Sequence, residues 1–173
     1  MMGNAMKTAI LVAAGLALMA ATAGVSQAAQ KAKVAALPAE QCVSLGKDVS
    51  RLVGFPVKAV TGNAQGHAFS NITGDACLLS GSATGLTQKT DVLFRLPTGL
   101  PGWKADPSYD ADGPMSTSVT YRKGDAWVSL SVSVDPPAGT CANVIIADCR
   151  IPMKRWVWTL DGMAFVSKTA PAF

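Results

Sequence analysis

Few residues in this chain are suited to acid–base or nucleophilic chemistry. His67 is the only histidine among the 173 residues, so a site built from several histidines is excluded and one candidate general base remains. Residues 81–85 (GSATG) place Ala83 where the nucleophile elbow of a hydrolase carries its serine. A small periplasmic hydrolase that uses His67 with a serine or an aspartate is one hypothesis, but the sequence leans away from an enzyme.

The richest group of binding residues lies in the proline-rich segment 97–115 (PTGLPGWKADPSYDADGPM). Prolines restrict the conformations of such a segment, and long ordered loops in compact domains are often functional. Rigid aromatic rings beside hydrogen-bond acceptors are typical of contact surfaces. We therefore expect this loop to contact a partner. Its candidate contact residues are Trp103, Asp106, Tyr109, Asp110 and Asp112.

Part of this segment is similar to a calcium-binding loop, but the agreement breaks down in detail. If Asp106 is the first ligand, Ala111 takes the position that requires glycine. If Ser108 is first, Val119 stands where the bidentate glutamate belongs. The alternative is a solvated turn whose aspartates accept hydrogen bonds from their own backbone. The sequence predicts neither a metal site nor a cofactor.

Four cysteines are present, at Cys42, Cys77, Cys141 and Cys149. An even number of cysteines in an exported chain indicates disulfides, and four allow three pairings. Pairing between sequence neighbours predicts Cys42–Cys77 and Cys141–Cys149. The spacing of the second pair fits neither a redox motif nor a zinc site.

The N-terminus has the features of an export signal. Lys7 precedes an apolar run, and Ser26-Gln27-Ala28 offers the small residues that signal peptidases read. We expect residues 1–28 to be a signal peptide, 29–37 a flexible leader and 38–173 a single domain. An uncleaved membrane anchor is the alternative. No second apolar span follows, so the processed protein is expected to be periplasmic or secreted.

Residues 38–53 predict an amphipathic helix. Pro38 suits the first turn, Gly54 follows the end, and Pro56 prevents continuation. Apolar residues three or four positions apart form one face, which consists of Cys42, Leu45, Val49, Leu52 and Val53.

Residues 116–134 (STSVTYRKGDAWVSLSVSV) predict a β-hairpin, because apolar and polar residues alternate in both arms. A turn at Lys123-Gly124 sets Val119 opposite Val128. One face is then apolar and the other is rich in serine and threonine, which is typical of an antiparallel sheet covered on one side.

Trp127 stands alone among the serines and threonines of the second face, where we expect Ser129 to be exposed. If the 97–115 loop covers Trp127, the ring forms a small second core. If nothing covers it, the ring is an exposed aromatic suited to stack on a sugar or a partner. Trp127 is therefore also a candidate binding residue.

The elements predict an α+β fold, with one N-terminal helix packed on an antiparallel sheet of about 5–6 strands and two disulfides. Besides the hairpin, strands are predicted at residues 57–61, 67–73, 76–84, 90–96 and 154–160. The predicted core consists of Leu45, Val49, Leu52, Val128, Leu130, Val132, Trp156 and Trp158.

The net charge of +4 is scattered along the chain, which argues against nucleic-acid binding. The sequence favours an exported binding domain of a bacterial-type cell envelope, an adaptor or an inhibitor, whose partner is a protein or another envelope component. A structural envelope protein without a specific ligand is a further alternative. Nothing in the sequence defines an oligomeric state.

Overall fold

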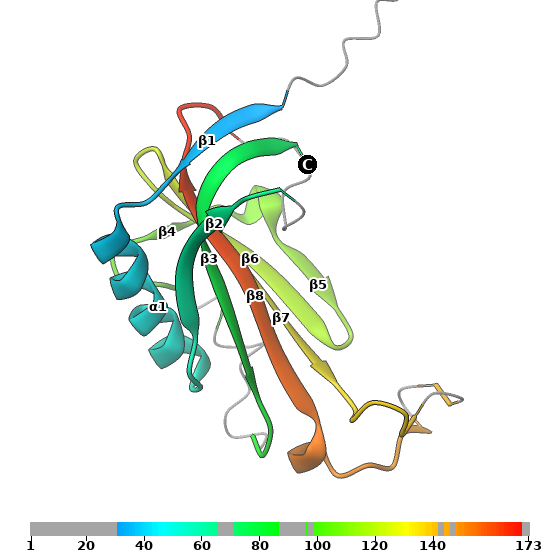
Figure 1. Ribbon diagram of the computed structural model, residues 1–173. Coiled ribbons are helices and arrows are strands. Elements are labelled where there is room, and N and C mark those ends of the chain that lie inside the picture. The colour runs from blue at the N-terminus through cyan, green and yellow to red at the C-terminus, as the bar shows by residue number, and fades with distance from the viewer. Residues whose placement is uncertain are drawn as a thin grey trace, which may run out of the picture.

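The computed structural model describes residues 31–65, 71–86, 96, 99–141, 144–145 and 148–170. One helix lies across one face of a mostly antiparallel eight-stranded sheet (Figure 1). The elements are β1 (Ala32–Ala36), α1 (Ala39–Val53), β2 (Lys58–Asn63), β3 (Ile72–Ala83), β4 (Lys104–Ala105), β5 (Ala111–Gly113), β6 (Ser116–Lys123), β7 (Ala126–Asp135) and β8 (Val157–Val166), with 3-10 turns η3 (Pro107–Tyr109) and η5 (Met153–Arg155).

The strand order is β2-β3-β1-β8-β7-β6-β4, and β5 also pairs with β6. The α+β class and the mostly antiparallel character of the sheet are confirmed, but the sheet has more strands than the sequence indicated. The prediction that the helix is the N-terminal element is corrected too, because β1 precedes α1. Among the described residues, no helix has the length and apolar character needed to cross a membrane.

The helix α1 begins and ends at the predicted signals. Pro38 precedes it, and Gly54 caps it in the left-handed conformation with its N–H donated to the Ser50 carbonyl at 2.9 Å. Gly46 faces β2 so closely that a Cβ there would lie 2.7 Å from the Cβ of Ala59. The Ser50 hydroxyl accepts the N–H of Val57 at 2.9 Å and so ties the helix to the chain that enters β2.

Both predicted disulfides are present. Cys42–Cys77 joins the buried face of α1 to β3, with 5.6 Å between the Cα atoms. Cys141–Cys149 closes a small ring in the connection from β7 to β8. In the loop-entropy model, a crosslink that closes a loop as long as the one between Cys42 and Cys77 stabilises the fold by about 3–4 kcal/mol.

The hairpin of β6 and β7 has a different register from the predicted one. Lys123 pairs with Ala126, so the turn is Gly124-Asp125 and Val119 lies opposite Leu130 instead of Val128. The pairing is displaced by two residues. Because side chains alternate with a period of two, this displacement leaves every residue on its predicted face.

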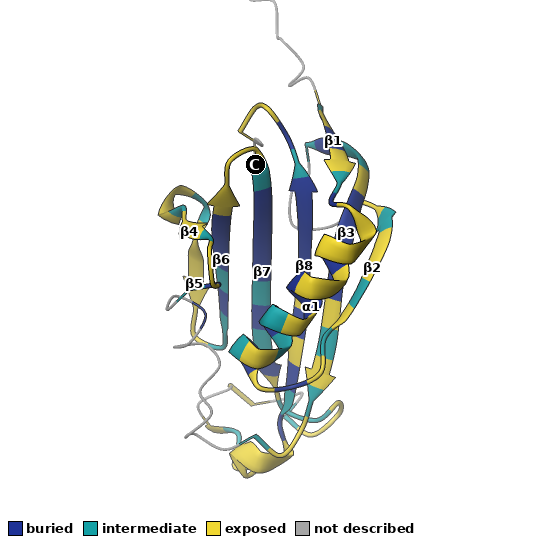
Figure 2. Ribbon diagram, turned by 90° about the vertical axis from the view of Figure 1, so that its left-hand side faces the viewer, coloured by how far each residue is buried: buried dark blue, intermediate teal, exposed yellow. Residues whose placement is uncertain are grey.

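The predicted core is buried on the α1 side of the sheet, with Leu52 only partly buried at its margin. Figure 2 shows this side, where the buried stretches of β7 and β8 lie behind the helix. Ser129 on the opposite face was expected to be exposed, but it is 5% exposed. The reason is a second buried cluster on that face, formed by Val34, Ala64, Ile72, Ala76, Trp127, Met163 and Phe165.

The strand β1 corrects the prediction of a flexible leader at residues 29–37. It pairs in parallel with β3 and antiparallel with β8, and so lies between them. The parallel contact depends on Gly74, which has a φ of 124° and lies so close to β1 that a Cβ would be 2.2 Å from the carbonyl oxygen of Val34. Only glycine fits such a position.

Leu130→Ala should lower the free energy of unfolding by about 2–5 kcal/mol, because this fully buried side chain leaves a cavity on the α1 side. Ser82→Ala, at an exposed position on the opposite face, should change it by less than about 0.5 kcal/mol. Denaturant unfolding followed by circular dichroism measures both. Equal losses would mean that the face carrying Ser82 is covered as well.

Gly74→Ala should destabilise the protein by about 1–3 kcal/mol more than Gly85→Ala, because the new methyl group displaces β1. Gly85 is a matched control, since its φ of 80° is also left-handed but no atom lies within 4 Å of a Cβ there. Denaturant unfolding gives the difference, and hydrogen exchange should accelerate at the β1 amides. Equal destabilisation by the two variants would contradict the close β1–β3 contact.

Candidate functional site

Within the segment 97–115, where we had expected a separate contact loop, β4 and β5 form an edge of the sheet. In β4, Lys104 pairs with Arg122 and Ala105 with Tyr121. In β5, Asp112 pairs with Thr117. Strands this short, in a segment with four prolines, present few free donors to a further strand. The segment therefore leaves little of this edge open to a further strand.

The two aromatic rings of this segment lie on opposite faces of the sheet. Trp103 is half-buried and packs against the core on the α1 side. Tyr109 packs against Trp127 in the second cluster, with ring centroids 5.7 Å apart and planes at 84°. The structure therefore does not bring Trp103 and Tyr109 together.

The three aspartates of the segment bond to nearby groups of the protein. Asp106 accepts the N–H of Ser108 at 3.3 Å, and Asp110 accepts the N–H of Thr120 at 2.9 Å. Asp112 accepts the hydroxyl of Thr117. Within the described parts of the chain, no three His, Cys, Asp or Glu residues are grouped so as to hold a metal ion.

Trp127 is 1% exposed, so its ring is covered and has no surface for a partner. Tyr109 contributes to the cover, and the guanidinium of Arg122 lies 4.8 Å from the ring centroid. The indole N–H donates to the carbonyl of Ser167 at 3.4 Å. Trp127 thus belongs to a second core, which also contains Val34 of β1 and Ile72 and Ala76 of β3. His67 lies outside the described residues.

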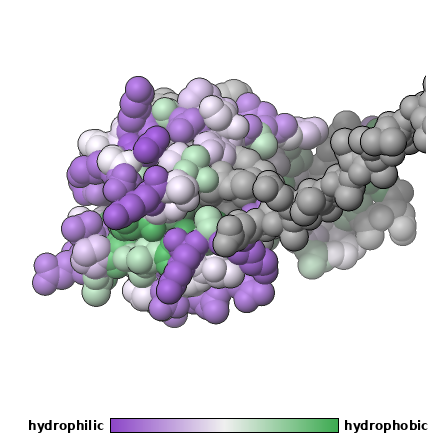
Figure 3. Space-filling model, turned by 90° about the horizontal axis from the view of Figure 1, so that it is seen from above, coloured by the Kyte–Doolittle hydropathy of each residue, from purple (hydrophilic) through white to green (hydrophobic). Residues whose placement is uncertain are grey.

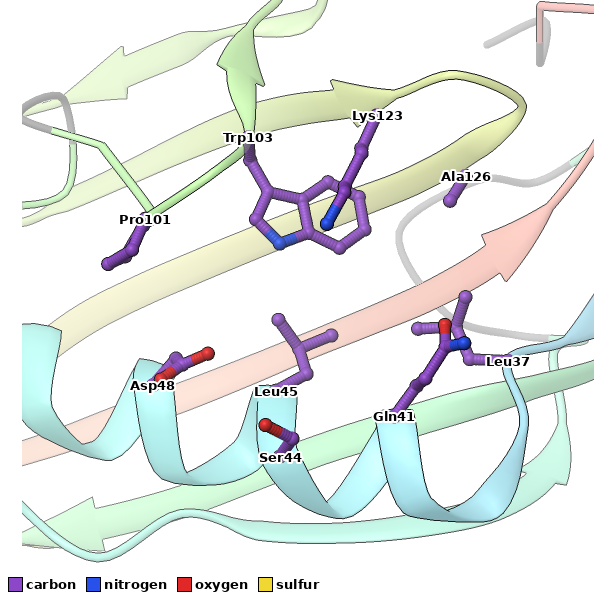
Figure 4. A pocket seen from close by; sticks show the side chains of 9 residues that line it. All are labelled: Leu37, Gln41, Ser44, Leu45, Asp48, Pro101, Trp103, Lys123 and Ala126. Atoms are coloured by element: carbon purple, nitrogen blue, oxygen red, sulfur yellow. The ribbon is translucent and has the colours of Figure 1, made fainter.

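A groove opens between α1 and the turn end of the β6–β7 hairpin, with Trp103 on its wall (Figure 4). Its volume is about 360 Å³. In the close view, Trp103 and Lys123 approach from the sheet side, and Gln41, Leu45 and Asp48 point toward them from α1. The lining residues are Leu37, Gln41, Ser44, Leu45, Asp48, Pro101, Trp103, Lys123 and Ala126.

The groove combines an apolar floor with a polar rim. Leu37 and Leu45 are almost completely buried, at 5% and 3% exposed, and provide the floor. Gln41 and Ser44 offer both hydrogen-bond donors and acceptors. Figure 3 shows the upper end of the molecule, where an apolar area is bordered by hydrophilic side chains.

The charges around the groove are unequal. Asp48 forms an ion pair with Arg51 and is therefore partly neutralised. Among the described residues, Lys123 has no carboxylate partner. Lys104 and Arg122 adjoin Trp103 and Lys123 in a neighbouring hollow. The sheet side of the groove is therefore electropositive and suited to an anionic ligand.

Sequence reasoning identified Trp103 but missed the rest of the groove. Gln41, Ser44 and Asp48 recur at helical spacing beside the buried stripe of α1. This pattern of polar residues was the available signal on the helix. Lys123 was interpreted only as a turn residue. Its position near α1 depends on how the helix docks on the sheet, and the sequence does not show that docking.

Comparisons with models of protein families, with curated proteins and with solved structures found no match.

Tyr121 holds the segment that positions Trp103. Its side chain is fully buried, and its hydroxyl donates to the carbonyl of Leu96, just before the segment. Its backbone pairs with Ala105, two residues after Trp103. Burial, and then the negative charge of Asp110, raises the pKa of Tyr121 to about 12.

A pH titration tests this environment. Phenolate absorbance should rise in a step near pH 12 that is missing in Tyr121→Phe. The raised pKa means that, above pH 10, the unfolded state releases the proton first. Between pH 10 and about 12, Tyr121 should therefore lower the free energy of unfolding of the wild-type protein by about 1.4 kcal/mol for each pH unit. Tyr121→Phe should not show this contribution. Rapid pH-jump mixing limits alkaline damage. A step near pH 12 that persists in the variant would contradict the assignment.

Proposed function

We propose that this protein is an exported binding domain that holds a segment of a partner protein in the groove between α1 and the β6–β7 hairpin. The observation that carries the proposal is the half-buried Trp103, which faces α1 across an apolar floor. Beside it lies the cation of Lys123, which has no carboxylate partner among the residues that the structure describes. Two disulfides and the N-terminal sequence support an oxidising compartment, either periplasmic or extracellular.

The size and lining of the groove favour a short polypeptide segment. A volume of about 360 Å³ is at the lower end for ligand pockets and suits one or two side chains. A peptide main chain offers donors and acceptors in alternation, which matches the amide of Gln41 and the hydroxyl of Ser44. The cations on the sheet side select an acidic residue next to an apolar one.

The groove residues support binding over catalysis. Among the described residues that line it, none is a histidine or a cysteine. Ser44 therefore has no histidine among these lining residues to take its proton. Trp103, in contrast, is of the residue type that most often dominates binding energy at interfaces.

The test is selection of peptides from a displayed random library on the protein released by a secreting host, followed by calorimetry. Trp103→Ala and Lys123→Glu should each weaken the selected peptides about tenfold or more, because loss of an interface anchor costs about 2 kcal/mol. Affinity should also fall with added salt, since exposed charges are screened.

Lys47→Glu is the matched control for Lys123→Glu. It makes the same charge change on α1, but Lys47 is exposed and does not line the groove. Trp103→Phe should retain part of the affinity, and melting temperatures of all variants exclude unfolding as the cause. The proposal fails if no peptide is selected, or if Lys47→Glu weakens binding as much as Lys123→Glu.

A further inference from the structure

The disulfide ring Cys141–Cys149 presents apolar side chains to solvent. Ile145 is 70% exposed and Val144 is 52% exposed, the two highest values among the large apolar residues that the structure describes. Single exposed apolar residues are common on protein surfaces. Here two are adjacent, in the connection from β7 to β8, whose described parts extend beyond the end of the sheet (Figure 1). They therefore require a separate explanation.

The ring holds these side chains away from the core. The N–H of Val144 donates to the Cys141 carbonyl at 3.4 Å, and the N–H of Asp148 donates to the Ile145 carbonyl at 2.9 Å. Cys149 packs against the core on the α1 side and so anchors the base of the ring. The crosslink and the turns therefore restrict the exposed pair to positions outside the core.

Basic residues gather at the same end of the sheet. Arg150 follows the ring directly, and Lys154 and Arg155 lie in η5, all three exposed. Met153, also in η5, adds a third large apolar side chain at 37% exposed. Apolar residues flanked by lysine and arginine are the pattern of surfaces that bind the interface of anionic bilayers.

We propose that this end of the protein docks on an anionic phospholipid surface. Val144 and Ile145 enter the boundary between headgroups and acyl chains, and Arg150, Lys154 and Arg155 pair with lipid phosphates. The proposal is independent of the groove, which lies at the other end of β7, about 33 Å away for a ten-residue strand. Docking therefore leaves the groove free.

The test is co-sedimentation with vesicles, using the protein that a secreting host releases, with removal of residues 1–28 confirmed by mass. One set of vesicles contains equal amounts of phosphatidylglycerol and phosphatidylcholine, and the other contains phosphatidylcholine alone. We expect partitioning to be at least tenfold stronger with the first set and to decrease with added salt.

Val144→Ser with Ile145→Ser, and Lys154→Glu with Arg155→Glu, should each reduce partitioning at least tenfold. Val43→Ser is the control for the first pair, because Val43 is 51% exposed on α1, away from the ring. Lys47→Glu with Lys58→Glu is the control for the second, and both controls should bind as the wild type does.

Three results would overturn the proposal. They are no partitioning of the wild-type protein, equal partitioning to both sets of vesicles, or retention of binding by the Val144→Ser, Ile145→Ser variant. If vesicles do not bind but sedimentation velocity shows a dimer that this variant abolishes, the exposed pair contacts a second copy of the chain instead of lipid.

Discussion

The apolar stripe of α1 is buried against β2 and β3, and the Cys42–Cys77 disulfide holds it there. Because the helix lies over this half of the sheet, it leaves the turn end of β6 and β7 without a helical cover. The edge segment fills part of that space with Trp103, and the remainder is the groove. The groove is thus a consequence of where the helix docks, and Gly46 and Ser50 fix that docking.

The two faces of β7 follow from its period of two, but they are covered to different extents. Val128, Leu130 and Val132 face α1 along the strand, and Trp127 is buried on the other side near the turn. Toward the ring, Ser131 and Ser133 are only partly buried. The face opposite α1 is therefore covered near the turn and only partly covered toward the ring.

Features set by neighbouring residues were predictable from the sequence, and features set by distant pairing were not. Helical periodicity and caps predicted α1, and alternation predicted both faces of the hairpin even though its register was displaced. The strands β1, β4 and β5 are two to five residues long, and the partners of β1 and β4 are not their neighbours in sequence. The residue type of Trp103 was enough to predict it as a candidate contact residue. Its separation from Tyr109 was not predictable, because it depends on which face of the sheet each ring packs against.

The position of β1 has a consequence for the order in which the chain can fold. Synthesis makes β1 before the other described strands, whereas β8, one of its two partners, is the last of them. The helix and the hairpin depend on local contacts and can form early, but the centre of the sheet stays open until β8 is present. Until β8 is present, the backbone groups of β3 that pair with β8 lack their partner strand, and an open strand edge of this kind is prone to pair with other chains.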